Sequence, residues 1–412
     1  MDKVNKSHVI KLYPTESQVS LLKQSCGVAR HSYNWALTKW KELCDIGEKP
    51  SAYSLIKLQN SIKKDEMPFY MGVSKTAPQY AIHNLETAYK NMWKHKKGYP
   101  KFKKKGNKDS YVAIENEKSF KQKNRKIWIS RIGWIKCAEN LRFEGKVNNV
   151  VVKRIADMWF AVINIEVSNS ILTLKHIKSD NQAIVGVDLG IKSMIALSDG
   201  TIYENPKALG TNLKSLKRLQ RGLSRKQKNS NNYKKQQIKI SRKHYRIVNI
   251  RKSAIHKATS EIVKKYDKII IESLDIKEMM KNHRLSKLLR DVSLGEITRQ
   301  FTYKTTWMKK EFVKADRFFA SSKLCSSCGY KKESLKLSDR IYKCNLCGLS
   351  LDRDINAAIN LANYSPTQES GESKACEAVA NVGLKDNSGA IKQEIEKLSN
   401  KLYRNVHHLK NL

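Results

Sequence analysis

Two Cys-x-x-Cys pairs constrain the local fold of this chain more tightly than any other feature. The first pair is Cys325 and Cys328, and the second pair, after fifteen intervening residues, is Cys344 and Cys347. Two pairs at this separation bring four thiolates within reach of one tetrahedral Zn²⁺ ion. Four thiolate ligands leave no open position for a reactive water molecule. We therefore expect one structural zinc ion that holds a small ribbon together and takes no part in chemistry.

Other uses of these cysteines fit the sequence less well. Disulfide bonds persist mainly in secreted proteins, and residues 1–6 lack the apolar stretch of a secretory signal. A redox-active dithiol needs only one such pair. The chain also has no run of about 18 consecutive apolar residues, so we expect no membrane-spanning helix. These observations predict a cytoplasmic protein.

The charge of the chain points to a polyanionic partner. Its 412 residues include 80 Lys and Arg against 38 Asp and Glu, which gives a formal net charge of +42. Such an excess destabilises a compact fold by self-repulsion unless a polyanion neutralises it. Nucleic acid is the abundant polyanion of the cell, so we expect a nucleic-acid-binding protein. A soluble basic protein without such a partner is the alternative.

The first hundred residues combine a strand with helices. Residues 8–13 predict a short strand, and a helix opens directly after it, where Thr15 and Gln18 match a capping box. Apolar residues recur at helical spacing over 28–43 and again over 81–92. This pattern predicts a small helical bundle.

A lysine-rich loop and a segment of alternating residues follow. Residues 94–108 interleave lysines with Tyr99 and Phe102, which suits phosphates and bases, although a solvated basic loop explains the composition as well. From about 111 to 170 apolar residues alternate with polar ones, and polar turns such as Asn148–Asn149 separate short strands. This part of the sequence predicts a small antiparallel β-barrel.

The second half has the signature of an α/β fold. Residues 183–190 and 268–271 predict buried strands. Between them, residues 205–260 contain no Asp or Glu and predict two long basic helices with a break at 229–232. Beyond about 365 the sequence is polar with little pattern, and we expect a disordered tail there.

Three carboxylates stand out in this second half. Asp188 and Glu272 each end an apolar strand, and Asp354 lies at the start of a predicted helix. Carboxylates at such strand ends converge in the crevice where open α/β sheets bind ligands. Oxygen ligands select Mg²⁺ or Mn²⁺, and two such ions support phosphodiester hydrolysis. Each residue also has a simpler explanation, because a strand-end Asp is often a turn residue and Asp352 or Asp354 could cap the helix.

These parts together resemble a known family. The resemblance rests on residues 186–192 (Gly-Val-Asp-Leu-Gly-Ile-Lys), Ile271–Glu272, residues 321–329 (Ser-Ser-Lys-Leu-Cys-Ser-Ser-Cys-Gly), residues 352–358 (Asp-Arg-Asp-Ile-Asn-Ala-Ala), the Pro14–Thr15 helix start and residues 98–103 (Gly-Tyr-Pro-Lys-Phe-Lys). These segments, in their order along the chain, resemble the TnpB family of compact, transposon-encoded RNA-guided nucleases related to type V CRISPR effectors. The resemblance covers most of residues 5–363.

The resemblance implies an RNase H-like fold of the RuvC type. Its catalytic and Mg²⁺-binding residues would be Asp188, Glu272 and Asp354, with the zinc ribbon inserted before the third. The N-terminal half resembles recognition helices inserted into a wedge-like β-barrel. The implied domains are residues 1–13 (first barrel strand), 14–110 (helical recognition domain), 111–178 (barrel), 179–320 (RuvC-like nuclease), 321–350 (zinc ribbon), 351–364 (last RuvC segment) and 365–412 (disordered tail).

The resemblance also implies partners and further site residues. Relatives bind a guide RNA and read a short motif beside a double-stranded target DNA, and Lys75, Thr76 and Gln79 lie where the motif-reading helix would be. Arg340 matches an arginine that in relatives lies near the cleavage site, where a bidentate cation could stabilise a pentavalent phosphate. An exposed ribbon arginine is the alternative for Arg340. The place of action would be the cytoplasm of a prokaryotic cell, at the nucleoid.

From these features we expect an RNA-guided DNA endonuclease. Two alternatives remain open. A catalytically silent RNA-guided DNA-binding repressor would lack one of the three carboxylates, and none is missing. A DNA transposase on the same fold would join DNA ends, whereas a nuclease leaves free 5′-phosphate and 3′-hydroxyl ends.

Overall fold

The computed structural model describes residues 3–106, 109–168, 183–335 and 339–365. The tail that the sequence predicts to be disordered lies outside the described residues from position 366 onward. None of the described helices combines the length and the apolar composition that a membrane span requires.

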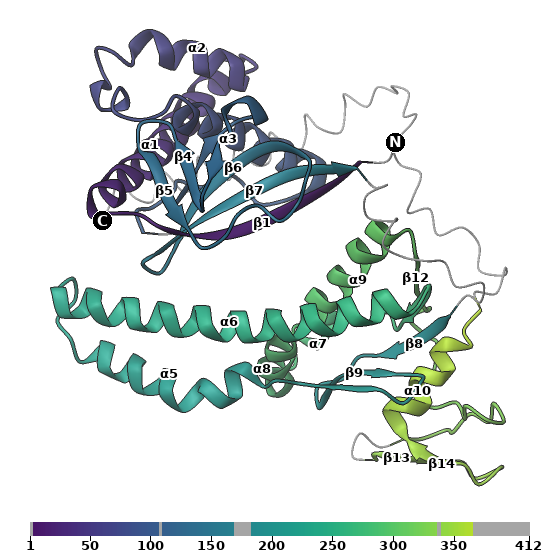
Figure 1. Cartoon of the computed structure of the whole chain (residues 1–412). Helices are drawn as coiled ribbons and strands as arrows, with labels where there is room; N and C mark the ends of the chain where they lie inside the picture. The colour runs from purple at the N-terminus through teal and green to yellow at the C-terminus, as the bar shows by residue number, and fades with distance from the viewer. Residues whose placement is uncertain (1–2, 107–108, 169–182, 336–338, 366–412) are drawn as a thin grey trace, which may run out of the picture. The chain divides into compact units, whose positions relative to one another are not determined.

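The N-terminal part begins with a strand and three α-helices (Figure 1). These elements are β1 (Lys3–Tyr13), α1 (Glu16–Asp45), α2 (Ala52–Ile62), the short 3-10 helix η1 (Pro68–Tyr70) and α3 (Thr76–His95). Helix α1 starts with the predicted capping box: Thr15 Oγ1 accepts a hydrogen bond from the Gln18 N–H, and Gln18 Oε1 accepts one from the Thr15 N–H. Helices α1 and α3 pack together and bury Leu37, Leu85 and other apolar side chains.

These helices pack against a seven-stranded antiparallel sheet. Its strands are β1, β2 (Ser110–Ile114), β3 (Gln122–Lys123), β4 (Lys126–Ile129), β5 (Gly133–Cys137), β6 (Lys146–Ile155) and β7 (Met158–Ser168), in the order β2-β6-β7-β1-β5-β4-β3. The short 3-10 helix η2 (Glu117–Ser119) lies between β2 and β3 along the chain. Alternate residues of β1 and β7, such as Ile10 and Ile163, are buried, as the period of two predicts. The pairing between described residues leaves β2 and β3 at the two ends of the order, so it does not close the predicted barrel.

One predicted turn in this sheet is wrong. Asn148 and Asn149 lie inside β6, at an irregularity in its register with β7. Their side chains bond to residues of other strands: Asn148 Nδ2 donates to Asn5 Oδ1 of β1 at 3.2 Å, and Asn149 Oδ1 accepts from Asn164 Nδ2 of β7 at 2.6 Å. Cross-strand partners and a bulge therefore accommodate two residues whose types favour turns.

A second, five-stranded sheet forms the C-terminal part. Its strands are β8 (Ile184–Asp188), β9 (Ser193–Leu197), β10 (Ile202–Glu204), β11 (Lys268–Ile271) and β12 (Glu311–Lys314), in the order β10-β9-β8-β11-β12. Strands β8, β11 and β12 are parallel, and β9 and β10 are antiparallel to their neighbours. The structure is thus a mixed α/β fold. Because helices cover both faces, the central strands are apolar on both sides and read as continuous hydrophobic runs.

Helices pack on both faces of this sheet. They are α5 (Ala208–Ser224), α6 (Asn231–Lys265), α7 (Ile276–Met279), α8 (His283–Val292), α9 (Leu294–Met308) and α10 (Arg353–Ala362). Ile262 of α6 and Phe301 of α9 pack in the same apolar cluster as Val187, whereas Leu361 of α10 packs with Ile270. Helices α5 and α6 run side by side (Figure 1), and the predicted break at 229–232 overlaps the start of α6 at Asn231, which Ser230 caps.

Candidate active site and cysteine cluster

The parallel register of β8 and β11 brings two of the predicted carboxylates together. The last paired residues are Val187 and Ile271, so Asp188 and Glu272 are the next residue on each strand. Asp188 is 8% exposed, and Glu272 is half-buried. Two adjacent parallel strands therefore end in carboxylates at the same edge of the sheet, as the sequence predicts.

The third carboxylate comes from the first turn of α10. Asp352 is the N-cap of this helix, and its carboxylate accepts hydrogen bonds from the N–H groups of Asp354 and Ile355 at 2.9 and 3.3 Å. The capping role that the sequence left open between two residues therefore belongs to Asp352, and the Asp354 carboxylate remains available. A Cβ atom added to Gly190, in the loop after β8, would lie 3.9 Å from Asp354 Oδ2. Asp354 thus lies beside the loop that follows Asp188.

The three carboxylates interact electrostatically. Burial, followed by the charges of Glu272 and Asp354, raises the pKa of Asp188 well above its usual range, although Arg353 opposes this. Burial also raises the pKa of Glu272 to about 7, with a further contribution from Asp354 and an opposing hydrogen bond from the Leu189 backbone. Buried acids that repel one another favour a bound cation, and oxygen donors of this kind suit Mg²⁺ or Mn²⁺. The residues present therefore fit a divalent ion.

The cysteines of the ribbon form the tightest group of potential metal ligands among the described residues. Among the described residues, the four cysteines form the one group of three or more metal-binding side chains whose ligand atoms all lie within 4.8 Å of one another.

An arginine that sequence reasoning did not single out faces this acidic group. Arg353 Nε lies 3.8 Å from Asp354 Oδ1, and the Arg353 N–H donates to the Arg340 carbonyl at 2.8 Å. The side chain of Arg340 is exposed. The structure therefore places the Arg340 backbone at the start of α10, while Arg353 is the cation beside the carboxylates. Its position between Asp352 and Asp354 was the signal available in the sequence.

The four cysteines of the ribbon have the geometry of a metal site. Cys325 Sγ lies 3.6 Å from Cys347 Sγ, and Cys328 Sγ lies 3.6 Å from Cys344 Sγ. A zinc ion with Zn–S bonds of about 2.3 Å requires sulfur atoms about 3.8 Å apart, whereas a disulfide requires about 2 Å. The glycine after each pair has a φ of +74°, which allows each knuckle to turn. The cluster therefore fits the predicted zinc ion, with β13 (Ile341–Lys343) and β14 (Ser350–Asp352) paired beside it.

Two asparagines of α10, the helix that carries Asp354, connect this helix to the zinc ribbon. Asn356 is fully buried; its Nδ2 donates to the Leu324 carbonyl at 2.7 Å, and its Oδ1 accepts from the Ser326 N–H at 3.0 Å. Asn360, one helical turn later, donates to the carbonyls of Ser321 and Leu324. Sequence reasoning missed this function, because a polar residue inside a helix identifies no partner by itself.

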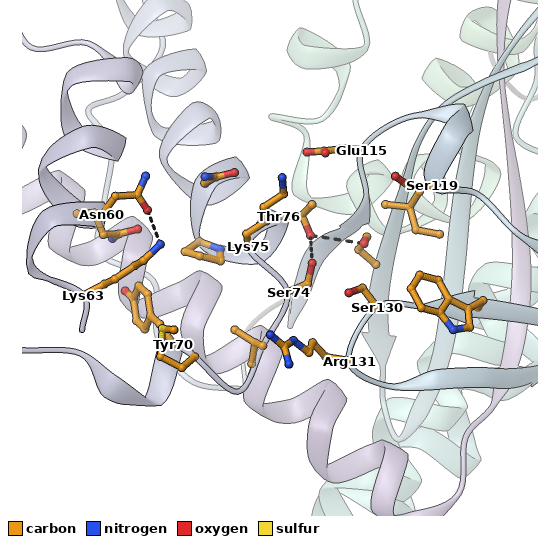
Figure 2. Close-up of a pocket in the computed structure, with 18 residues that line it drawn as sticks. Asn60, Lys63, Tyr70, Ser74, Lys75, Thr76, Glu115, Ser119, Ser130 and Arg131 are labelled. Atoms are coloured by element: carbon orange, nitrogen blue, oxygen red, sulfur yellow. Dashed lines mark hydrogen bonds between the residues drawn. The ribbon is translucent and has the colours of Figure 1, made fainter. Parts of the chain in front are cut away.

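The predicted motif-reading residues line a cavity of about 450 Å³ in the N-terminal part. Figure 2 shows Lys75 and Thr76 at the start of α3, together with Ser130 and Arg131 from the turn between β4 and β5. Thr76 is buried and hydrogen-bonds to Ser74, whereas Lys75 is exposed, and Gln79 is partly exposed. The cavity is thus lined by helix and sheet residues, with polar and cationic groups directed into it.

The predicted aromatic residues of the lysine-rich loop are half exposed. Tyr99 and Phe102 have exposed fractions of 54% and 53%, and Lys41 Nζ lies 5.8 and 5.6 Å from the two ring centroids. The loop is fastened to α1, because Asn34 exchanges two hydrogen bonds with the Lys103 backbone. The loop is therefore held against α1 at Lys103, with the rings of Tyr99 and Phe102 on its surface.

Family models match three segments of the chain. A model described as "Probable transposase" (OrfB_IS605) matches residues 162–283, and one described as "Cas12f1-like, TNB domain" matches residues 295–361. A model described as "Helix-turn-helix domain" matches residues 1–49, where the structure has β1 and the single long helix α1.

Curated relatives match nearly the whole chain. A protein of Escherichia coli K12 named "Putative RNA-guided DNA endonuclease InsQ" is 30% identical over 372 residues, covering 85% of this chain and 90% of the relative. A Streptomyces pristinaespiralis protein named "Putative RNA-guided DNA endonuclease" is 31% identical, covering 88% and 89%. A Cas12f1 chain solved in complex with single-guide RNA and target DNA shares the fold, with a TM-score of 0.54 and 14% identity over 88% of this chain and 99% of the other.

Proposed function

This chain belongs to the TnpB family, and from that premise we propose that it is an RNA-guided DNA endonuclease that hydrolyses phosphodiester bonds of a target DNA. The single observation that carries the proposal is the convergence of Asp188, Glu272 and Asp354 in a strongly basic chain. No member of this acidic group is missing, so a silent DNA-binding repressor has no support in the site.

In this proposal, residues 179–320 and 351–364 form an RNase H-like nuclease domain of the RuvC type, interrupted by the zinc ribbon 321–350. Support comes from two carboxylates on adjacent parallel strands and a third on α10, which packs against β8. Residues 14–110, inserted between the segments 1–13 and 111–178 that contribute the strands of the N-terminal sheet, form the recognition domain. The protein acts on DNA in the cytoplasm of its cell.

The mechanism assigns a task to each charged side chain. Asp188, Glu272 and Asp354 would hold two divalent ions, which when bound supply an activated water molecule and charge stabilisation for the leaving oxygen. Arg353 balances the acidic charge through Asp354 until the substrate arrives. Arg340 is exposed next to the start of α10, where its guanidinium is available to a phosphate of the bound strand. Asp188 is largely buried, and its low-dielectric surroundings would strengthen its electrostatic attraction for a divalent ion.

The basic surfaces provide the nucleic-acid contacts. Residues 205–260 carry 17 Lys and Arg and no acid, and they form the α5–α6 pair. Such a surface binds the backbone of an RNA–DNA duplex by charge and shape, while guide pairing supplies the sequence choice. The cavity lined by Lys75, Thr76 and Gln79 would read the short motif beside the target. Tyr99 and Phe102 would contact nucleic acid from the lysine-rich loop.

The test begins with the RNA that copurifies with the protein. Sequencing it identifies the guide, and a matched double-stranded DNA with Mg²⁺ then serves as the substrate. We expect the wild type to cut and the Asp188→Ala variant to be inactive. Asp65→Ala removes an exposed carboxylate of the helical part and should cut normally. Unchanged cleavage by Asp188→Ala would reject the assignment of the active site.

The description "Probable transposase" favours one second candidate function, strand transfer on the same fold. The two functions differ in product. A nuclease leaves free 5′-phosphate and 3′-hydroxyl ends, whereas a transposase joins one DNA to another. Sequencing the products of the same reaction therefore distinguishes them.

A further inference from the structure

One aromatic side chain near the carboxylates is left in solvent. Phe318 is 88% exposed, more than any other large hydrophobic side chain in the described ranges. The next residue behaves oppositely: the Phe319 ring packs against Tyr364, with a centroid distance of 4.9 Å, and joins the cluster of Ile270 and Leu361. Phe319 therefore anchors the loop in the apolar cluster, whereas Phe318 projects from the loop into solvent.

The loop that carries Phe318 is held by hydrogen bonds. The Phe318 N–H donates to Asp316 Oδ1 at 2.7 Å, and the Phe319 N–H donates to the Asp316 carbonyl at 3.1 Å. The Asp316 N–H in turn donates to the Tyr364 hydroxyl at 3.2 Å. The exposure of the ring is thus part of a fixed turn, although the hydrophobic effect favours burial.

The register of the sheet places this turn at the same edge as the carboxylates. Strand β12 is parallel to β11, and the Ala315 N–H continues the ladder by donating to the Ile271 carbonyl at 2.8 Å. Ala315 is therefore level with Glu272, and Phe318 follows three residues later. An ion pair of 3.7 Å between Arg317 Nη1 and Asp275 Oδ2 joins this turn to the segment after Glu272.

We propose that Phe318 is a stacking platform for an unpaired base of the DNA strand that is cut. An aromatic face accepts any base, which suits an enzyme whose sequence choice lies in its guide. Bases inside a duplex already stack on both faces, so the occupant must be single-stranded. The cut strand is the one nucleic acid that has to reach Asp188, Glu272 and Asp354. The exposed cations Lys314 and Arg317 lie within four residues of the ring and can contact its phosphates.

The inference rests on the proposed function, and cleavage kinetics test it in that context. The full-length protein with its RNA is compared with Phe318→Ala and Phe318→Trp on matched DNA with Mg²⁺. We expect Phe318→Ala to raise KM about tenfold, in line with the loss of one base–aromatic stack, with a smaller effect on kcat, and Phe318→Trp to restore KM. The matched control Ile46→Ala removes another exposed apolar side chain and should leave KM unchanged. Equal KM for the wild type and Phe318→Ala would overturn the proposal.

A binding experiment separates this inference from the nuclease assignment. The Asp188→Asn protein is titrated with single-stranded DNA that carries 2-aminopurine, whose fluorescence falls on stacking. We expect quenching that Phe318→Ala abolishes and Ile46→Ala preserves. If the wild type does not cut DNA but this quenching occurs, the proposed function fails and the stacking platform stands. Quenching by single-stranded RNA of the same sequence, but not by the DNA, would overturn the assignment of the occupant.

Discussion

Gly186 of β8 lies directly against the backbone of Ala358 in α10. A Cβ atom added to Gly186 would lie 1.9 Å from the Ala358 carbonyl oxygen and 2.4 Å from the Ala362 nitrogen. Helix α10 can approach the sheet this closely only because residue 186 has no side chain. Because Asp188 follows on the same strand and Asp354 begins the same helix, this contact sets the separation of two site carboxylates.

Replacement of Gly186 by alanine should therefore displace α10. We expect Gly186→Ala to reduce cleavage at least tenfold and to destabilise the fold by about 1–3 kcal/mol, the usual range for overpacking a core. Cleavage rates and urea unfolding measure the two effects. Gly27→Ala is the matched control, since Gly27 lies in α1 and its added Cβ would meet only Arg30 Nη2, at 3.9 Å. Full activity of Gly186→Ala would show that the carboxylates tolerate a shift of α10.

The buried amide of Asn356 should fix the position of α10 relative to the zinc ribbon. The variant Asn356→Ala loses two hydrogen bonds and leaves the Leu324 carbonyl and the Ser326 N–H without these partners, which costs about 1–3 kcal/mol for each buried group. We expect a lower Tm and weaker cleavage with zinc content unchanged. The exposed Asn363, at the end of α10, provides the control Asn363→Ala, which should match the wild type. Loss of zinc from Asn356→Ala would instead indicate that this residue supports the cluster itself.

The parts of the site that could be predicted from sequence are those formed by residues close to one another along the chain. The cysteine spacing, the capping box at Thr15 and the acids that end β8 and β11 each depend on neighbours within a few residues. Asn148 and Asn149 were wrongly predicted to form a turn because their hydrogen-bond partners, Asn5 and Asn164, lie on other strands. The contributions of Arg353, Asn356 and Phe318 depend in the same way on tertiary contacts between segments distant in sequence.

Removal of zinc should unfold the ribbon and, through it, weaken the active site. Purified protein should contain about one zinc per chain, as a closed four-thiolate site requires. We expect Cys344→Ser, or treatment with a strong chelator, to lower Tm and cleavage together, because metal binding at such sites is coupled to folding. Cys44 is an exposed cysteine outside the cluster, so Cys44→Ser should keep both the zinc and the activity. Folded, active protein without zinc would contradict the prediction.

The raised pKa values of the carboxylates predict that stabilisation by Mg²⁺ depends on pH. Burial and the charge of Asp354 raise the pKa of Glu272 to about 7, above that of an ordinary glutamate, so the fold favours its protonated form. Protonation of Glu272 therefore stabilises the folded state. This contribution to the free energy of unfolding is complete below the unfolded-state pKa of about 4.3 and is lost as pH rises through about 7. Since Mg²⁺ binds the ionised group, the increase in Tm caused by Mg²⁺ should be larger at pH 8 than at pH 6. Differential scanning fluorimetry measures this increase. In Glu272→Gln the difference between the two pH values should shrink, and a wild-type increase that is equal at both would refute the argument.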